Sequence, residues 1–184
     1  MAKVFAFLAD GLEEVECLAV VDVLRRSGVE TTLVSVTGKR EITGSHGIVF
    51  LADALFEDVN PDEADVLFLP GGMPGTTNLK AHGGLAAAIE KANQQGRRVA
   101  AICAAPSILG AMGLLKGRTA TCYPGFEELL VGVSYTSQGV VTDGNITTAR
   151  GLGYALDLGL ELIRLLQGSQ HSEQVKEAIQ YDRF

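Results

Sequence analysis

The chain has 184 residues, of which 47% are hydrophobic and 20% are charged. This length and composition predict one globular domain, residues 1–184, with a large core, and they disfavour a disordered chain. The formal net charge is −7 and no block of Lys or Arg is present, so we expect no stable nucleic-acid binding and no anionic membrane partner.

The cysteines and the start of the chain bear on metal binding and on compartment. Cys17, Cys103 and Cys122 are an odd number and cannot all form disulfides, and none has the spacing of a zinc site. Only a short apolar run precedes the first acidic residues, unlike the run of a secretory signal. We therefore predict a cytoplasmic protein in a reducing compartment, without a metal.

The first half of the chain alternates short apolar runs, typical of buried strands, with segments of helical periodicity. In chain order, the sequence predicts a strand at 3–8, a helix from about 13 to 26, a strand at 31–36, a small hairpin at 41–43 and 48–52, an acidic turn-rich segment at 53–65, a strand at 66–69 and a helix at about 85–95. The first strand and the helix after it form a βα unit.

The second half continues the pattern. In chain order, the sequence predicts a strand at 99–102, a helix from 106 to about 115, a strand at 117–121, a helical turn at 127–130, strands at 134–137, 139–142 and 145–149, a helix to about 166, and a last helix or subunit contact within 169–184. The almost uncharged stretch 99–115 is shorter than the ~20 residues of a membrane span and contains Pro106, Gly110 and Gly113. We therefore exclude a membrane helix there.

Cys103 stands at the joint between a predicted strand and a predicted helix, and Pro106 suits the first turn of that helix. The aligned peptide dipoles at a helix N-terminus stabilise an anion, so we expect the thiol pKa to fall below its ordinary value of about 8.5. A free cysteine is also commonly buried as a small hydrophobe. The joint alone leaves the reactive and the structural interpretation open.

The helix predicted from about residue 13 carries an unusual set of acids. Its core-facing stripe follows from helical spacing: Cys17, Val20, Val21 and Leu24. Extended backwards, this stripe places Glu13 and Glu16 on the inward face and Glu14 on another side. An inward carboxylate needs a partner or a proton. Attraction to the helix dipole also explains acids at a helix start, but it explains Glu16 less well than Glu13 and Glu14.

Loop residues supply further candidates. Residues 70–75 form a glycine-rich turn directly after a strand, where backbone N–H groups can approach a ligand or an oxyanion closely, although such a turn also serves chain reversal. The turn matches neither the dinucleotide nor the nucleoside triphosphate motif. Arg150, at a strand end, fits anion binding or loop fixation equally. His46 and His82 fit solvated loop positions.

Four motifs together resemble the ThiJ/PfpI family, in the branch of the Parkinson-disease-associated protein deglycase and its bacterial relatives. They are FLADGLEEVE at residues 7–16, LPGGMPG at 69–75, AICAAP at 101–106 and ARGLG at 149–153. The resemblance covers nearly the whole chain in the right order. It implies an α/β fold, namely a flavodoxin-like three-layer sandwich with a mostly parallel central sheet, and a homodimer.

The resemblance also implies roles for single residues. Cys103 is the expected nucleophile and Glu16 the carboxyl group hydrogen-bonded to it, while the backbone N–H groups of Gly72 and Ala104 are expected to form an oxyanion hole. No cofactor is implied. We expect a further set of residues to line the pocket: Glu13, Gly71, Tyr123 and Arg150.

The chain departs from the family pattern at three positions. Animal members have a His where this chain has Tyr123, so a Cys-His dyad is in doubt there. Protease-type members have a His directly after the Cys, where this chain has Ala104, so peptidase activity is not expected. Some members have an Arg near the pocket where this chain has His46, which alters the expected preference for anionic ligands.

Two functions follow as hypotheses. The first is a cofactor-independent glyoxalase or deglycase that acts on methylglyoxal, glyoxal or their early adducts on protein and nucleotide groups. The second is a redox-sensing, stress-protective protein or chaperone that uses oxidation of the same Cys103. Both use the same residues, so the sequence does not separate them. A role in thiamine metabolism or amidotransfer would rest on the fold alone. No feature of the sequence supports it, and fold does not imply function.

Overall fold

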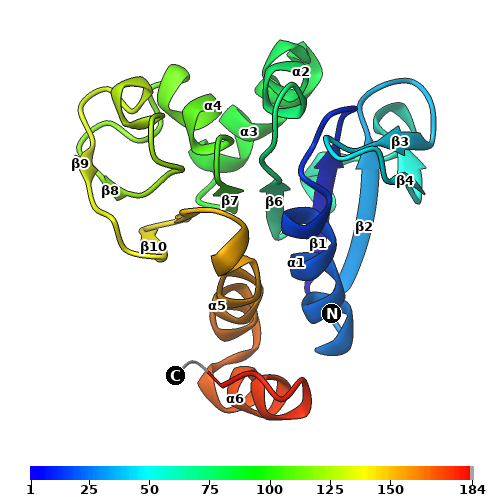
Figure 1. The fold of residues 1–184 in the computed structure, drawn as a ribbon, viewed down its shortest axis with the longest axis vertical. Coiled ribbons are helices and arrows are strands. Elements are labelled where there is room, and N and C mark those ends of the chain that lie inside the picture. Colours follow the sequence, from blue (N-terminus) through cyan, green and yellow to red (C-terminus); the bar gives the residue numbers. More distant parts are fainter. Residues whose placement is uncertain (183–184) are drawn as a thin grey trace.

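A seven-stranded sheet forms the centre of the computed structural model, which describes residues 1–182 (Figure 1). The strand order is β10-β11-β7-β6-β1-β2-β5, and every neighbouring pair is parallel except β10 with β11. The strands are β1 (Lys3–Leu8), β2 (Glu30–Ser35), β5 (Ala54–Leu55), β6 (Val66–Leu69), β7 (Arg98–Ile102), β10 (Val140–Asp143) and β11 (Ile146–Ala149). The mostly parallel sheet expected from the sequence is confirmed.

The central strands are apolar because both faces of the sheet are covered. Successive side chains of a strand point to opposite faces. In β1, Val4, Ala6 and Leu8 belong to one buried cluster, whereas Phe5 and Phe7 belong to the other. All four residues of β6 are buried. Because both faces of these strands are buried, their sequences are nearly continuous apolar runs.

Helices cover the sheet on both faces and complete a three-layer sandwich. The helices α1 (Glu14–Arg26), α5 (Ala155–Gln167) and α6 (Ser169–Ala178) contribute to the cluster around Leu8. The helices α2 (Gly75–Ala81), α3 (Gly83–Gln94) and α4 (Pro106–Ala111) contribute to the cluster around Phe7. Figure 1 shows α2, α3 and α4 grouped at the top of the view and α5 and α6 at the bottom. No helix within residues 1–182 is long and apolar enough to cross a membrane.

Short elements surround this core. The predicted hairpin is present as β3 (Glu41–Thr43) and β4 (Val49–Leu51), and β8 (Thr119–Ala120) pairs with β9 (Ser134–Tyr135). Residues 1–182 also contain four 3-10 helices: η1 (Phe56–Asp58), η2 (Pro61–Glu63), η3 (Glu127–Leu129) and η4 (Leu152–Tyr154). The tail predicted as a helix forms α6, and its last two residues lie outside the described part.

Three predictions about elements were wrong. The segment 53–65 was expected to be acidic and rich in turns, without a strand, yet it contains β5, an edge strand too short to give a pattern. The helix α2 was missed because its only buried long apolar side chain is Leu79. The helix α4 ends at Ala111 and not near residue 115, because Gly113 adopts a positive φ of 73°, which ends a helix.

His82 was expected to be solvated, but it has a structural role. The ring is half-buried, and its Nδ1 accepts a hydrogen bond of 3.0 Å from the backbone N–H of Leu85 in the first turn of α3. The imidazole also packs edge-on against Phe56, with ring centroids 4.6 Å apart. His82 therefore caps α3 by satisfying an N–H group that the helix leaves free.

Candidate active site

Cys103 lies at the joint between β7 and α4, as the sequence predicted, and its backbone is strained. Its φ is 63°, in the left-handed region that residues other than glycine rarely adopt. The surrounding chain holds it there. The N–H of Cys103 donates to the carbonyl of Ala149 at 2.9 Å, and its carbonyl accepts from the N–H of Tyr123 at 2.8 Å. Strained residues of this kind are enriched at active sites.

Glu16 points inward from the first turn of α1, and this prediction is confirmed. The residue is 1% exposed, and its Oε2 has no partner of good hydrogen-bonding geometry among the described residues. Burial raises the pKa of Glu16 to about 7, although hydrogen bonding with Cys103 and with the backbone N–H groups of Gly71 and Leu152 opposes the rise. A large fraction of Glu16 therefore keeps its proton near neutral pH.

The same environment raises the pKa of the Cys103 thiol, whereas the sequence predicted a lowered pKa. Burial raises the pKa of Cys103 to about 12, and the negative charge of an ionised Glu16 adds to the rise, while the N–H groups of Gly72 and Ala104 lower it. The prediction of a low thiol pKa was therefore wrong. Desolvation and the neighbouring carboxylate raise the pKa by more than the N-terminus of the six-residue helix α4 lowers it. At a pH between the pKa values of Glu16 and Cys103 the pair therefore holds one proton, which lies mainly on the Cys103 sulfur, and transfer of that proton to Glu16 generates the thiolate.

The glycine loop brings the two groups together. A Cβ at Gly71 would lie 2.5 Å from Cys103 Cβ and 2.5 Å from Glu16 Oε2, so no side chain fits between them. Gly72 has a positive φ of 88°, and a Cβ there would lie 2.2 Å from the backbone N of Glu13. This close backbone approach directs the Gly72 N–H towards the sulfur. The loop therefore does more than reverse the chain.

We expect Gly71→Ala to damage this arrangement. The added methyl group must displace Cys103 or Glu16, so the free energy of unfolding should fall by about 1–3 kcal/mol. Alkylation of Cys103 by iodoacetamide should also slow, because its proton partner moves. Chemical denaturation and timed mass spectrometry measure the two effects. Gly83→Ala is the matched control, because its Cβ would meet no atom within 4 Å; equal behaviour of both variants would contradict the packing argument.

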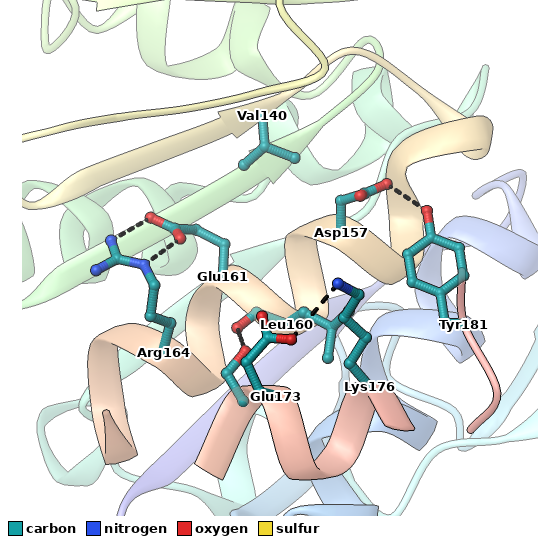
Figure 2. A pocket seen from close by; sticks show the side chains of 9 residues that line it. Val140, Asp157, Leu160, Glu161, Arg164, Glu173, Lys176 and Tyr181 are labelled. Carbon is teal, nitrogen blue, oxygen red and sulfur yellow. Dashed lines mark hydrogen bonds and ion pairs between the residues drawn. The ribbon is translucent and has the colours of Figure 1, made fainter. Parts of the chain in front are cut away.

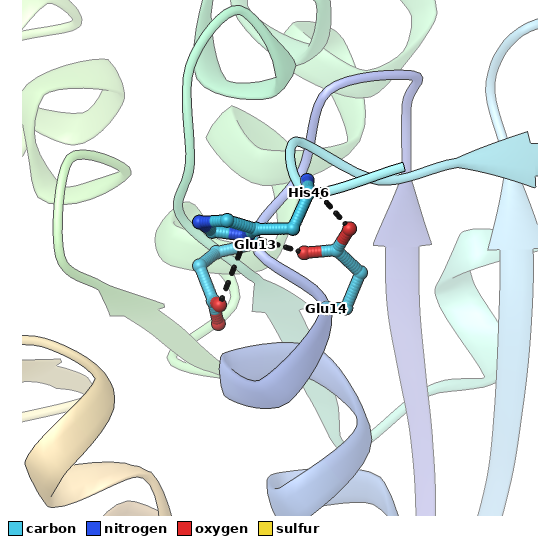
Figure 3. A group of neighbouring side chains, drawn as sticks. All are labelled: Glu13, Glu14 and His46. Atoms are coloured by element: carbon cyan, nitrogen blue, oxygen red, sulfur yellow. Dashed lines mark hydrogen bonds and ion pairs between the residues drawn. The ribbon is translucent and has the colours of Figure 1, made fainter. Parts of the chain in front are cut away.

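Glu14 is buried, which corrects its expected place on another side of the helix. The loop between β3 and β4 covers it: the N–H of His46 donates to Glu14 Oε1 at 2.8 Å, and His46 Nδ1 lies 2.9 Å from Glu14 Oε2 (Figure 3). Burial acts to raise the pKa of Glu14, but hydrogen bonds from His46 and Ile48 overcome it and lower the pKa to about 2. Glu14 therefore anchors the hairpin.

Glu13, Glu14 and His46 offer three possible metal ligands within 4.8 Å of one another. Protein hydrogen bonds already engage these groups. Glu13 Oε2 accepts from the N–H of Glu16 at 2.6 Å and so caps α1, and both oxygens of Glu14 bond to the hairpin loop. The structure therefore satisfies these carboxylates without an ion, which agrees with a role in fixing the start of α1.

A cavity of about 300 Å³ lies beside the reactive pair, lined by Tyr123, Pro124 and the segment 150–154. Tyr123 and Arg150 are among its lining residues, whereas Glu13 and Gly71 lie elsewhere: Glu13 caps α1 and Gly71 packs between Cys103 and Glu16. Leu152 also lines the cavity, and the sequence did not predict this. The feature that could have indicated it is the position of Leu152 just after the end of a predicted strand.

A second hollow of about 420 Å³ lies between β10, α5 and α6 (Figure 2). Two ion pairs line it, Glu161 with Arg164 at 2.6 Å and Lys176 with Glu173 at 3.5 Å, and the hydroxyl of Tyr181 donates to Asp157 at 2.9 Å. It contains no cysteine and is formed by other elements than the site around Cys103.

Comparisons with known proteins agree with this geometry. Residues 2–165 match the DJ-1/PfpI family. The chain is 38% identical over 175 residues to the protein DJ-1 homolog B of Arabidopsis thaliana, covering 94% of this chain but 40% of that protein. It is 35% identical over 167 residues to a deglycase of Pyrococcus abyssi, covering 90% of this chain and 99% of that protein.

A solved structure extends the similarity to three dimensions. The oxidised DJ-1 of Toxoplasma gondii superposes with a TM-score of 0.95 at 30% identity, covering 100% of both chains. The similarity in sequence and in structure thus includes all elements that hold Cys103, Glu16 and the glycine loop. The chain therefore belongs to the DJ-1/PfpI family.

Proposed function

We propose that the protein is a cofactor-independent glyoxalase or deglycase, which converts 2-oxoaldehydes such as methylglyoxal and glyoxal, free or as early adducts, into 2-hydroxy acids. The observation that carries the proposal is the buried Cys103–Glu16 pair, in which one carboxyl oxygen has no partner of good geometry among the described residues. Such a pair supplies a nucleophile and a proton relay at one point. The similarity to a deglycase of Pyrococcus abyssi supports it.

The first step uses the shared proton. With the proton on Glu16, the Cys103 thiolate attacks the aldehyde carbon, a C–S bond forms, and the carbonyl electron pair moves to the oxygen. The N–H groups of Gly72 and Ala104, which donate to the sulfur in this structure, are positioned to hold the developing oxyanion. Glu16 then gives its proton to that oxygen. The product is a hemithioacetal and an ionised Glu16.

The second step moves hydrogen between the two carbons. Glu16, now a base, takes the C–H proton from the former aldehyde carbon and gives it to the neighbouring carbonyl oxygen, which forms an enediol. It then takes the proton of the hemithioacetal hydroxyl group and returns it to the neighbouring carbon, which leaves a thioester and a 2-hydroxyl group. One carbon is oxidised and the other reduced, so the step needs no external oxidant. Water then breaks the C–S bond of the resulting thioester, which releases the 2-hydroxy acid and restores the thiol. A pKa of about 7 suits Glu16 to act as acid and base near neutral pH.

A second candidate function uses the same residues. Peroxide would oxidise Cys103 reversibly to a sulfenic acid or further to a sulfinate, and a protonated Glu16 would donate a hydrogen bond to the product. The half-buried position of Cys103 leaves the sulfur reachable, whereas Cys17 and Cys122 are fully buried. Similarity to the Toxoplasma gondii protein, whose structure is of an oxidised form, favours this candidate as an alternative.

One paired experiment tests the proposal against this alternative. The wild-type protein is incubated with methylglyoxal, without glutathione or added metal, and lactate is measured by chromatography. A second sample receives mild peroxide and its intact mass is recorded. We expect catalytic formation of lactate in many equivalents per protein. A mass increase of one or two oxygen atoms on Cys103 with no lactate would reject the enzyme and favour the sensor.

A further inference from the structure

The cavity beside Cys103 has two apolar walls, and each is attached to one member of the reactive pair. The N–H of Tyr123 donates to the carbonyl of Cys103 at 2.8 Å. The N–H of Leu152 hydrogen-bonds the carboxyl group of Glu16. These bonds hold the backbone of Tyr123 and of Leu152 against Cys103 and Glu16, and both residues line the same cavity.

Gly151 keeps the space between this cavity and Glu16 open. A Cβ at Gly151 would lie 3.2 Å from the ring of Tyr123 and 3.8 Å from Glu16 Oε1. The φ of Gly151 is 161°, an extended conformation that any residue can adopt, so the backbone does not require glycine here. The missing side chain leaves room for a substrate that reaches from the Glu16 carboxyl group to the Tyr123 ring.

The cavity surface is suited to a hydrocarbon group. Its walls include the ring of Tyr123, the pyrrolidine of Pro124 and the side chain of Leu152. Tyr123 is 50% exposed and Leu152 is 49% exposed, so both retain apolar surface that a ligand can cover. Burial of apolar surface of this kind drives the binding of small molecules. A volume of about 300 Å³ far exceeds what the methyl group of methylglyoxal occupies.

We propose, building on the proposed function, that this cavity binds the substituent of the substrate. The preferred substrates are then 2-oxoaldehydes with an aromatic or branched aliphatic group, and methylglyoxal and glyoxal are poorer ones. Tyr123 and Leu152 act as specificity-determining residues. The two backbone hydrogen bonds hold the walls of the cavity against Cys103 and Glu16, so a dicarbonyl group attached to the bound substituent would face the reactive pair.

The kinetic test compares phenylglyoxal with methylglyoxal. We expect kcat/KM of the wild type to favour phenylglyoxal by about 10-fold or more, the range that apolar pocket contacts provide. In Leu152→Ala and in Tyr123→Ala, the loss for phenylglyoxal should exceed the loss for methylglyoxal by about 10-fold. The matched controls are Leu129→Ala and Tyr135→Ala, which are 52% and 38% exposed outside the cavity and should keep the wild-type ratio.

A labelling test separates this inference from the proposed function, because it needs no turnover. Benzyl and methyl methanethiosulfonate each form a mixed disulfide with Cys103 and release methanesulfinate, and intact mass gives the rates. We expect the benzyl reagent to react faster with the wild type, and Leu152→Ala to remove that preference. Turnover of methylglyoxal without any benzyl or phenyl preference would overturn the inference alone. Benzyl preference without turnover of any 2-oxoaldehyde would reject the enzyme and leave the pocket assignment intact.

Discussion

Cys103→Ser should abolish conversion of methylglyoxal to lactate, with a loss of at least about 10³-fold in kcat/KM. The serine hydroxyl is far less acidic than a thiol, and a carboxyl group whose pKa is about 7 cannot generate an alkoxide from it. Lactate formation by the purified variant, followed at methylglyoxal concentrations well below KM, measures the loss. Because Ser and Cys differ little in size at this half-buried position, the free energy of unfolding should change by no more than about 1 kcal/mol.

Cys122→Ala is the matched control for this loss. Cys122 is fully buried in the cluster around Phe7 and lies outside the reactive pair, so its variant should keep turnover close to that of the wild type. Denaturation curves of both variants show whether they fold. A folded Cys103→Ser protein that still forms lactate at the wild-type rate would reject the nucleophilic mechanism.

Glu16→Gln should lower kcat by about 10²–10⁴-fold, because a glutamine cannot move protons between the substrate carbons. The amide N–H still donates to the sulfur and carries no charge. The charge of an ionised Glu16 helps to raise the pKa of Cys103, so the thiol of the variant should ionise at lower pH than in the wild type. The rate of iodoacetamide alkylation against pH measures this shift. A variant that is inactive but alkylates more readily identifies Glu16 as the relay.

The same substitution should change how stability depends on pH. Burial raises the pKa of Glu16 from 4.5 to about 7, so the folded protein holds this proton more tightly than the unfolded chain. Its favourable contribution is complete below pH 4.5 and is lost as pH rises through 7. Wild-type stability should therefore fall relative to Glu16→Gln across this window, by up to about 3 kcal/mol. Urea denaturation at several pH values measures the difference.

Glu14→Gln serves as the control with the opposite sign. Glu14 is equally buried in the same helical turn, but hydrogen bonds from the hairpin lower its pKa to about 2. Its carboxylate therefore stabilises the fold above pH 4.5, and this contribution is lost as pH falls towards 2. The variant should be less stable at neutral pH and keep its turnover. If Glu14→Gln lost as much activity as Glu16→Gln, the specific relay role would be rejected.

The sequence was sufficient to predict the strands and the helix that hold Cys103 and Glu16. The apolar runs of β1, β6 and β7 were found because strands buried on both faces contain few polar residues. Helical periodicity placed Cys17 and Glu16 on the inward side of α1, and both are buried. The change of pattern around Cys103 marked the joint at which the strained cysteine lies. Each of these inferences depends on the local order of residues.

Other features depended on segments far apart in the chain. Glu14 is buried because the loop around His46 folds over it, and periodicity describes only the helix to which Glu14 belongs. The edge strand β5 gains its pairing from β2, and its two residues carry no pattern of their own. The cavity exists because Tyr123 and Leu152, which follow different strands, meet beside Gly151.

By itself, the sequence determined the α/β alternation, the position of Cys103 and the inward direction of Glu16, because local patterning encodes which side of an element is apolar. Only the tertiary structure decided the protonation of the pair. A pKa depends on how many atoms of other elements exclude water from a charge, and here that desolvation outweighs the start of the six-residue helix α4. The packing of the whole molecule thus raises the pKa of both Cys103 and Glu16.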